Sequence, residues 1–409
     1  MMSTQTANNK VLPPPSARST ALGWVLTNLL NTWYNSLLTL AALALIFIIL
    51  RGTITWAFGA ARWEVVPANL RLFLVGQYPS QSPDTPDQIW RIWFDLYLLA
   101  ATIGLSWGVW VRQRETASWV LVGAPIVIAM LPFSWPVRLK IVALSVVGVF
   151  FWWLGKRWKP FFQRVTITLW IAYFPVAVFI INGFGPEDTG FLPSVPTRLW
   201  GGLLLSILLA IVGIVVSFPI GVALALGRQS SLPVLRTFSV LYIELIRGVP
   251  LISLLFMGQV MLPLFLPQGI SPDRVIRAMV AITMFAAAYL AENVRGGLQA
   301  ISKGQHEAAY ALGLNGFQTM TFIILPQALR TVIPVLVGQF IALFKDTSLV
   351  AIVGLLDLLG IARGVIANPK FIGTQREVFL FISLFYFVLS YTLSYASRRL
   401  EVALGVGQR

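Results

Sequence analysis

The segment EAAYALGLNGFQTMTFIILPQALR, residues 307–330, stands between two strongly apolar stretches of the chain. Its first part, over 305–312, is rich in alanine and favours a helix, and Glu307 suits the positive end of the helix dipole. Gly313 is expected to end this helix in the left-handed conformation. A second short helix-forming run follows and closes at Pro326. The segment therefore predicts a helix, a tight turn and a second helix, together too broken to cross a membrane.

The composition around this segment is that of an integral membrane protein. Of 409 residues, 57% are hydrophobic and 11% are charged, whereas a soluble globular protein carries roughly 25% charged residues. Apolar runs of about 20 residues, long enough to cross the roughly 30 Å hydrocarbon layer, recur along the chain. We expect an all-α polytopic helix bundle of about ten transmembrane helices, within a range of about eight to ten. The expected spans are roughly 32–50, 92–111, 118–135, 139–154, 165–182, 199–226, 237–267, 276–294, 331–354 and 378–396.

Several functional classes are excluded by residues that the sequence lacks. It has no cysteine, which excludes disulfides, thiolate metal sites and cysteine nucleophiles, and the single histidine, His306, cannot build a zinc site. The phosphate-binding loop G-x-x-x-x-G-K-[ST] is absent, because the nearest approach places Arg157 after Lys156, where serine or threonine is required. We expect no catalytic residue, no cofactor and no metal.

The placement of basic residues predicts how the chain is oriented in the membrane. The net charge is +15, but most basic residues flank apolar runs, so we interpret them as orienting the spans rather than binding nucleic acid. With a cytoplasmic N-terminus, the densest basic cluster falls on the inside. We therefore expect a multi-pass bacterial inner-membrane protein with both termini in the cytoplasm. The cluster consists of Lys156, Arg157, Lys159 and Arg164.

Ionisable residues within apolar runs are concentrated in the second half of the chain. In the first half, Asp95 is the exception. Such groups are costly at membrane depth and usually face a cavity, a pathway or a partner. The pattern E-x-x-R-G occurs twice, and in a helix its spacing lets the carboxylate meet the guanidinium on one face. The charged residues of the second half are Glu244, Arg247, Glu292, Arg295, Lys345 and Asp346.

The segment 307–330 resembles the EAA loop of permease subunits of ATP-binding-cassette (ABC) importers. The loop has the pattern E-A-A, three residues, then G, which Glu307, Ala308, Ala309 and Gly313 match. Further phrases follow the order of the polar amino acid subfamily, which includes histidine, glutamine and general L-amino acid permeases. They are Y-x-E-x-x-R-G-x-P from Tyr242 to Pro250, G-Q-x-E-A-A from Gly304, L-P-Q-A-x-R from Leu325 and K-D-T-S-L from Lys345.

This resemblance implies how the chain is divided. It covers residues 199–399 and implies a type I ABC importer permease domain of about five spans, with the coupling loop at 303–330. The extra spans over 31–198, again about five, resemble the N-terminal extension of long M subunits of general L-amino acid permeases. Residues 1–30 lack the apolar core of a signal peptide and are expected to form a disordered cytoplasmic tail, and 400–409 a second cytoplasmic tail.

The resemblance also implies partners. The EAA segment would be a coupling helix seated in a groove of a cytoplasmic ATPase, so that ATP hydrolysis belongs to another chain. Glu307 would contact the groove rim, Ala308 and Ala309 would permit close approach, and Gly313 would permit the bend. The assembly would comprise a second permease subunit, homologous or identical, two ATP-binding subunits and a periplasmic binding protein. From the residues alone, an amphipathic helix lying on membrane lipid or on the bundle's own end is the alternative.

An amino acid substrate brings a carboxylate and an ammonium group into the membrane and needs partners of both signs. Arg247 and Lys345 are candidates for the carboxylate, and Glu244 and Asp346 for the ammonium group. The alternative is that these charges pair with each other or cap helix ends and hold the bundle together.

Two backbone features shape this predicted pathway. Pro250 is expected to break its span, freeing backbone groups that are tolerated where they line a cavity. Lys345 lies about 17 Å of helix beyond Pro334, which places it roughly midway across the bilayer. Thr347 and Ser348 either cap an unwound turn and offer hydroxyls or pack against other helices.

The leading hypothesis is a permease subunit that moves polar L-amino acids across the inner membrane, coupled to a separate ATPase. The alternative is a secondary transporter or channel for small polar solutes, driven by an ion gradient. A secondary transporter would usually show two comparable, repeat-related halves. The two halves of this sequence differ in character.

Overall fold

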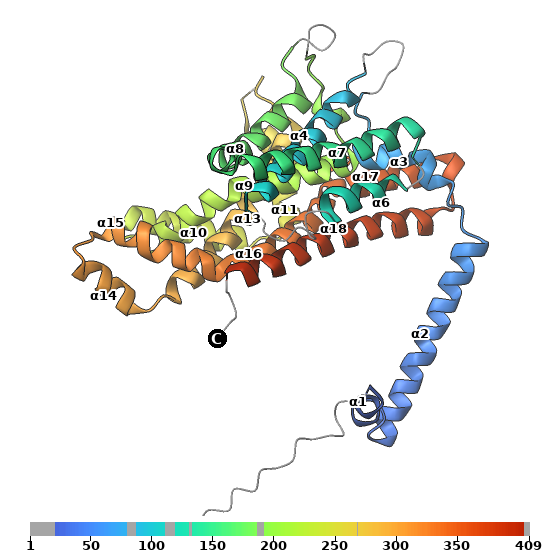
Figure 1. Cartoon of the computed structure of the whole chain (residues 1–409), viewed down its shortest axis with the longest axis horizontal. Coiled ribbons are helices and arrows are strands. Elements are labelled where there is room, and N and C mark those ends of the chain that lie inside the picture. Colours follow the sequence, from blue (N-terminus) through green and yellow to red (C-terminus); the bar gives the residue numbers. More distant parts are fainter. Residues whose placement is uncertain are drawn as a thin grey trace, which may run out of the picture. The chain divides into compact units, whose positions relative to one another are not determined.

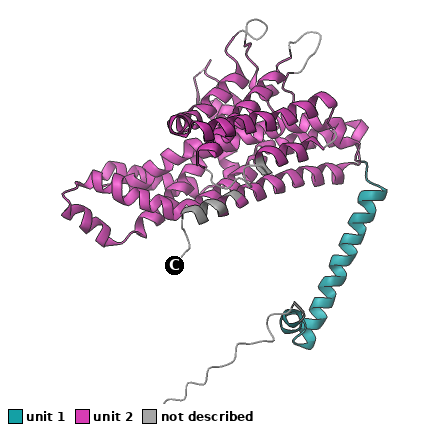
Figure 2. Cartoon of the chain, in the orientation of Figure 1, with its two compact units in different colours: residues 1–62 teal, residues 63–409 magenta. Residues whose placement is uncertain are grey.

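The computed structural model describes residues 21–79, 87–110, 119–130, 133–185, 192–267 and 269–404. Every regular element in these ranges is a helix, so the predicted all-α class is confirmed. The chain divides into two compact units, residues 1–62 and residues 63–409 (Figure 2).

The described part of the first unit, from residue 21 onward, forms the helices α1 (Ala21–Asn28) and α2 (Trp33–Gly59). The hydroxyl of Thr32 caps α2 by accepting the backbone N–H of Asn35 at 3.4 Å. α2 is apolar on every side and has no buried residue, which is typical of a helix surrounded by lipid. The expectation of a disordered tail over 1–30 is wrong from Ala21 onward, where α1 forms; residues 1–20 lie outside the described residues.

The second unit begins with helices of the predicted N-terminal extension, seen from blue to green in Figure 1. α4 and α7 pack closely because glycines lie at their contact: a Cβ on Gly108 would be 2.3 Å from the carbonyl oxygen of Trp152. Small residues allow such close approach of membrane helices. The elements are α3 (Val65–Val75), α4 (Ile89–Trp110), the π-helix η2 (Trp119–Gly123), α6 (Ala124–Ala129), α7 (Trp135–Arg157) and α8 (Lys159–Asn182).

The remaining helices include α13, which packs against α9, α10 and α16. Small residues of α13, among them Ala278, Ala287 and Ala291, are fully buried in this core. The elements are η3 (Thr197–Leu199), α9 (Gly202–Arg228), α10 (Pro233–Arg247), α11 (Leu251–Phe256), η4 (Met257–Met261), α12 (Leu262–Phe265), α13 (Arg274–Gln299), α14 (Lys303–Ala311), α15 (Gly316–Gln318), η5 (Thr319–Ile324), α16 (Leu325–Asp346), η6 (Thr347–Val353), α17 (Leu358–Ala367), η7 (Pro369–Phe371) and α18 (Gln375–Leu404).

Within the described residues, eight helices are long and apolar enough to cross a membrane, or nine if the broken pair α10 and α11–α12 forms one span. This agrees with the predicted range. The expected span over 118–135 is represented only by the short helices η2 and α6, while 111–118 and 131–132 are not described.

The expected break at Pro250 is confirmed. α10 ends at Arg247, α11 begins at Leu251, and the two segments are bent by 102°. Proline has no backbone N–H to continue the helical hydrogen bonds, and its ring obstructs the preceding turn.

Candidate functional site

The predicted helix and turn of the EAA segment are present as α14 and the residues that follow it. Gly313 has φ +79° and so adopts the left-handed conformation that the sequence predicted. Its N–H donates to the carbonyl of Tyr310 at 2.9 Å, and the N–H of Leu314 donates to that of Ala309 at 3.1 Å. These bonds satisfy carbonyl groups at the end of α14 and reverse the chain. In Figure 1, α14 and α15 lie together at one end of the second unit.

The second helix of the segment differs from the prediction. It begins with a reciprocal capping box, in which the Asn315 and Gln318 side chains accept each other's backbone N–H at 2.9 and 3.0 Å. It then continues through η5 into α16, giving a helical stretch from Gly316 to Val353. Pro326 therefore does not close it. The π-helical turn of η5 precedes Pro326 and accommodates the backbone where proline provides no N–H.

The two alanines of the EAA motif have different surroundings. Ala308 is exposed, whereas Ala309 is 2% exposed and contacts the chain's own residues. α14 turns the Ala309 side chain inward, and its expected role in the approach of another protein stays a prediction. Ala308 and Glu307 remain on the outer surface.

An apolar surface surrounds the exposed part of the motif. Leu312 is 79% exposed and Phe317 is 77% exposed, on either side of the turn at Gly313. No hydrogen bond or ion pair joins the Glu307 carboxylate to another described residue. Exposed apolar side chains grouped with an unpaired carboxylate are typical of a protein–protein contact. We call this the elbow surface; it consists of Glu307, Ala308, Tyr310, Leu312, Gly313 and Phe317.

A side-chain contact connects the elbow to the bundle. The amide nitrogen of Gln327, in α16, donates to the side-chain oxygen of Gln305, in α14, at 3.1 Å. The same nitrogen donates to the carbonyl oxygen of Ile323 at 2.8 Å. α14 also packs against η5. A displacement of α14 would therefore be passed to the long helix that contains α16.

The charged residues of the two E-x-x-R-G phrases come together between helices α9, α10 and α13. Nη1 of Arg228 lies 2.9 Å from Glu244 and 3.4 Å from Glu292. Arg247 lies 3.8 Å from the same carboxylate of Glu292, which Arg295 also pairs with. Glu244 and Arg247 therefore both form ion pairs in this cluster, and both stay at least partly exposed.

Arg228 was missed as a member of this cluster, although it stands where an apolar run ends. Its partners are distant in sequence, so the pairing could not be read from local spacing. Arg247 has a second contact, since its guanidinium carbon lies 5.5 Å from the ring centre of Tyr289. It is partly exposed, so one side of it remains accessible to a ligand.

The K-D-T-S-L phrase lies where α16 changes into the 3-10 helix η6. Lys345 is exposed and Asp346 is half-buried, and no hydrogen bond or ion pair joins either to the charge cluster within the described ranges. Thr347 is buried and donates its hydroxyl to the carbonyl of Phe344 at 2.7 Å, so that hydroxyl serves the helix end; Ser348 is half-buried.

The expected depth of Lys345 rested on a helix starting near Pro334. That premise is wrong, because the helical stretch starts at Gly316. Lys345 therefore lies close to the far end of α16.

The N-terminal extension holds two buried ionisable residues, of which the sequence revealed only one. Arg91 is 0% exposed and donates to the carbonyls of Pro193 at 2.7 Å and Ile180 at 3.4 Å. Asp95, one turn along α4, is buried too, and its carboxylate oxygens have no hydrogen-bond partner in the described part of the chain. Arg91 thus ties α4 to the end of α8 and to the segment leading into α9.

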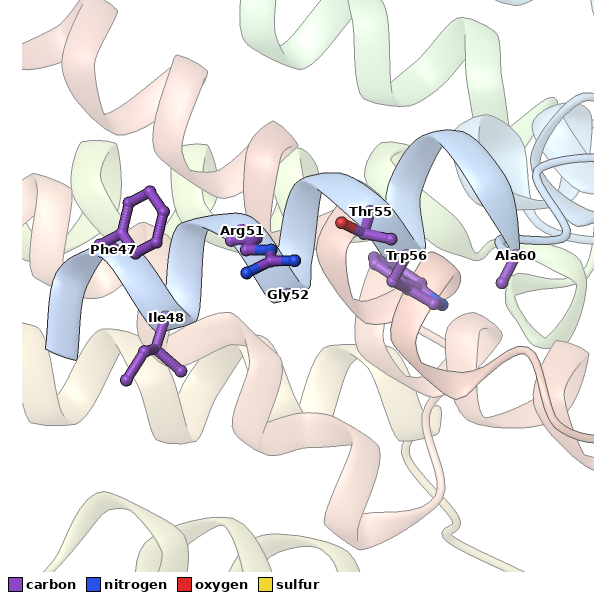
Figure 3. A pocket seen from close by; sticks show the side chains of 7 residues that line it. All are labelled: Phe47, Ile48, Arg51, Gly52, Thr55, Trp56 and Ala60. Atoms are coloured by element: carbon purple, nitrogen blue, oxygen red, sulfur yellow. The ribbon is translucent and has the colours of Figure 1, made fainter. Parts of the chain in front are cut away.

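A hollow of about 510 Å³ lies on α2, beside Phe47, Arg51 and Trp56 (Figure 3). The residues that line it are all in α2, apart from Ala60, which caps the end of that helix. One helix face cannot enclose a solute, so this hollow is not a transport pathway.

Known proteins resemble the chain along nearly its whole length. The family described as "Binding-protein-dependent transport system inner membrane component" matches residues 217–404. The inner membrane amino-acid ABC transporter permease protein YhdY of Escherichia coli K12 is 36% identical and covers 97% of both chains. The glutamate/glutamine/aspartate/asparagine transport system permease protein BztC of Rhodobacter capsulatus is 34% identical and covers 95% of both.

A shorter relative matches a smaller part. The probable glutamine ABC transporter permease protein GlnP of Bacillus subtilis is 39% identical over 97% of its own length but 54% of this chain. The predicted resemblance is thus confirmed, and the chain belongs to the family of amino-acid ABC transporter permeases.

Proposed function

We propose that this chain is the permease subunit through which polar L-amino acids enter across the inner membrane. The import is driven by ATP hydrolysis on a separate cytoplasmic ATPase, which binds the elbow surface. The observation that carries the proposal is the elbow itself. It combines an unpaired carboxylate, exposed apolar side chains and a rigid turn, and Gln305 links it to α16. The names of BztC and GlnP specify polar amino acids, which supports this substrate class.

We further propose a second permease subunit, two ATPase subunits and a periplasmic binding protein as partners. BztB of Rhodobacter capsulatus carries the same transport-system name as BztC and is 47% identical to this chain over 116 residues. Two related permeases in one system support a heteromeric pair. The family's printed description, binding-protein-dependent transport, supports the binding protein.

For the pathway, we propose that Arg247 meets the substrate carboxylate. Its ion pair with Glu292 is long, at 3.8 Å, and its guanidinium is partly exposed. Glu244 is exposed although it pairs with Arg228, so it remains the candidate for the ammonium group. Lys345, Asp346 and Ser348 are secondary candidates, because nothing in the described residues joins them to this cluster.

Glu307→Lys should test the docking of the ATPase. We expect ATP-dependent uptake and co-purification of the ATPase to fall at least tenfold. The introduced lysine would either face a cation of the ATPase or have no partner at the contact, and either arrangement costs more than about 1.4 kcal/mol of binding free energy. Arg236→Glu, which reverses an exposed charge on α10, is the control and should leave both unchanged. Normal uptake in Glu307→Lys, or uptake in proteoliposomes driven by an ion gradient without ATP, would contradict the proposal.

We also propose that the elbow and both termini face the cytoplasm, as the basic α7–α8 turn suggests. The natural chain has no cysteine, so single cysteines can be introduced directly. We choose Ile270→Cys, just before α13, and Lys303→Cys, just after it, because the two ends of this spanning helix face opposite sides of the membrane. An impermeant maleimide added to intact spheroplasts should label the first and spare the second; the reverse pattern would invert the topology.

A further inference from the structure

The turn between α7 and α8 carries four positive charges, and no aspartate or glutamate among the described residues pairs with them. From Trp135 to Asn182 the chain contains no aspartate and no glutamate. The cations of the turn are exposed, and none of them forms an ion pair with another described residue. They are Lys156 and Arg157 at the end of α7, and Lys159 and Arg164 in the first turns of α8.

The length of the two helices places this charge at the membrane surface. α7 has 23 residues and α8 has 24, so each is about 35 Å long and slightly exceeds the roughly 30 Å hydrocarbon layer. Trp158 alone separates them. A one-residue connection cannot carry its charges away from the bilayer, so they lie at the depth of the lipid phosphates.

Aromatic rings accompany the cations. Trp158 is 55% exposed and Phe161 is 65% exposed. The Trp158 ring stacks on Phe162 with centroids 6.4 Å apart, and Nζ of Lys156 lies 5.5 Å from the ring centre of Trp152. Aromatic rings are favoured where headgroups meet acyl chains. A ligand with a phosphate and acyl chains can contact the cations and the exposed rings together, whereas an acidic protein surface would match the cations alone.

The end of α7 that leads into the turn packs closely against α4. A Cβ on Gly108 of α4 would be 2.8 Å from the backbone nitrogen of Lys156, and one on Gly155 would be 2.8 Å from the carbonyl oxygen of Leu105. α4 therefore fixes the end of α7 that presents Lys156. A site on a rigid element loses less conformational entropy when a ligand binds.

We propose that the α7–α8 turn binds the phosphate headgroup of an anionic phospholipid. Lys156, Arg157, Lys159 and Arg164 supply the positive charge that attracts the phosphate, and Trp158 and Phe161 contact the start of the acyl chains. This site is independent of amino acid transport and of the elbow surface. It gives the N-terminal extension a role of its own, as the part of the permease that retains specific lipids.

Native mass spectrometry of the full-length chain tests the site, with phosphatidylglycerol and phosphatidylcholine supplied together in detergent. We expect the natural chain to retain phosphatidylglycerol preferentially, and the preference to weaken with added salt. Each cation near an anionic surface contributes about 1 kcal/mol, so Lys156→Gln should lower the preference about fivefold. Replacing all four cations by glutamine should abolish it.

Lys140→Gln is the matched control. It removes a lysine from the opposite end of α7 that lies 5.5 Å from the ring centre of Trp93, the same arrangement as Lys156 with Trp152. This variant should keep the preference. Thermal unfolding in phosphatidylcholine should be alike for all variants, which separates lost binding from lost folding.

Three results would overturn the site. One is an unchanged preference in the fourfold variant, and another is an equal loss in Lys140→Gln. The third is competition by glycerol phosphate as effective as that by intact phosphatidylglycerol, which would make the turn a general anion site. If the turn binds an acidic protein rather than lipid, replacing its four cations should leave the preference for phosphatidylglycerol unchanged, which is the first of these results.

Discussion

At Gly313 the backbone conformation, rather than the space around it, restricts the residue. A Cβ there would meet nothing within 4 Å, but φ is +79°. Gly313→Ala should therefore strain the elbow by about 1–2 kcal/mol without a steric clash. We expect the affinity for the ATPase to fall by about tenfold.

Gly304→Ala provides the comparison for this prediction. Gly304 lies in the first turn of α14, also with nothing within 4 Å, and its φ is not positive. Pull-down of the ATPase with each variant measures the difference. Equal affinities for the two variants would show that the conformation of Gly313 does not matter for docking.

Single residues were predictable where their own chemistry decides the outcome. The left-handed Gly313 and the break at Pro250 follow from what glycine and proline permit. The inward direction of Ala309 depends on how α14 is rotated against η5, which short spacing does not reveal. The partner of Glu244 was missed because Arg228 lies on a different helix, α9.

Among the elements, the contact of α4 with α7 makes the sharpest prediction. Gly108→Ala should place a methyl group 2.3 Å from the carbonyl oxygen of Trp152, which forces the helices apart. Overpacking of this kind costs about 1–3 kcal/mol. We expect a lower unfolding temperature in detergent.

Replacing a glycine at a less crowded position by alanine should raise the unfolding temperature instead of lowering it. Gly338 lies within α16 and has nothing within 4 Å of an added Cβ. Gly338→Ala should stabilise the protein by about 0.5–1 kcal/mol, because alanine loses less backbone entropy in a helix. An unfolding temperature that rises for Gly108→Ala, or falls for Gly338→Ala, would contradict the packing described for these helices.

The boundaries of elements were less predictable than their existence. Apolar length identified most of the spans, because burial in lipid requires it. It could not show that the helix after Gly316 passes Pro326 without a break, since this depends on the π-helical turn of η5. It also could not show that the region from 118 to 135 would form only short helices in its described part.

At the scale of the whole molecule, the chain joins a permease domain to an additional set of helices. The family match lies within 217–404, and GlnP matches 54% of the chain, while YhdY and BztC match nearly all of it. The predicted boundary near residue 198 stays a prediction, because the two compact units divide at residue 62. The family's motifs, rather than composition, identified the function.

The central claim is that an ATPase binds the elbow surface, and site-specific cross-linking tests this claim most directly. Ala308→Cys and Ala309→Cys introduce a thiol at neighbouring positions of a chain that otherwise has none, one exposed and one 2% exposed. With a maleimide that carries a photoreactive benzophenone, which inserts into C–H bonds of whatever lies beside it, and with the assembled transporter, we predict that Ala308→Cys cross-links to the ATPase and that Ala309→Cys does not. Absence of an ATPase adduct from Ala308→Cys, in a complex that still contains the ATPase, would contradict the account.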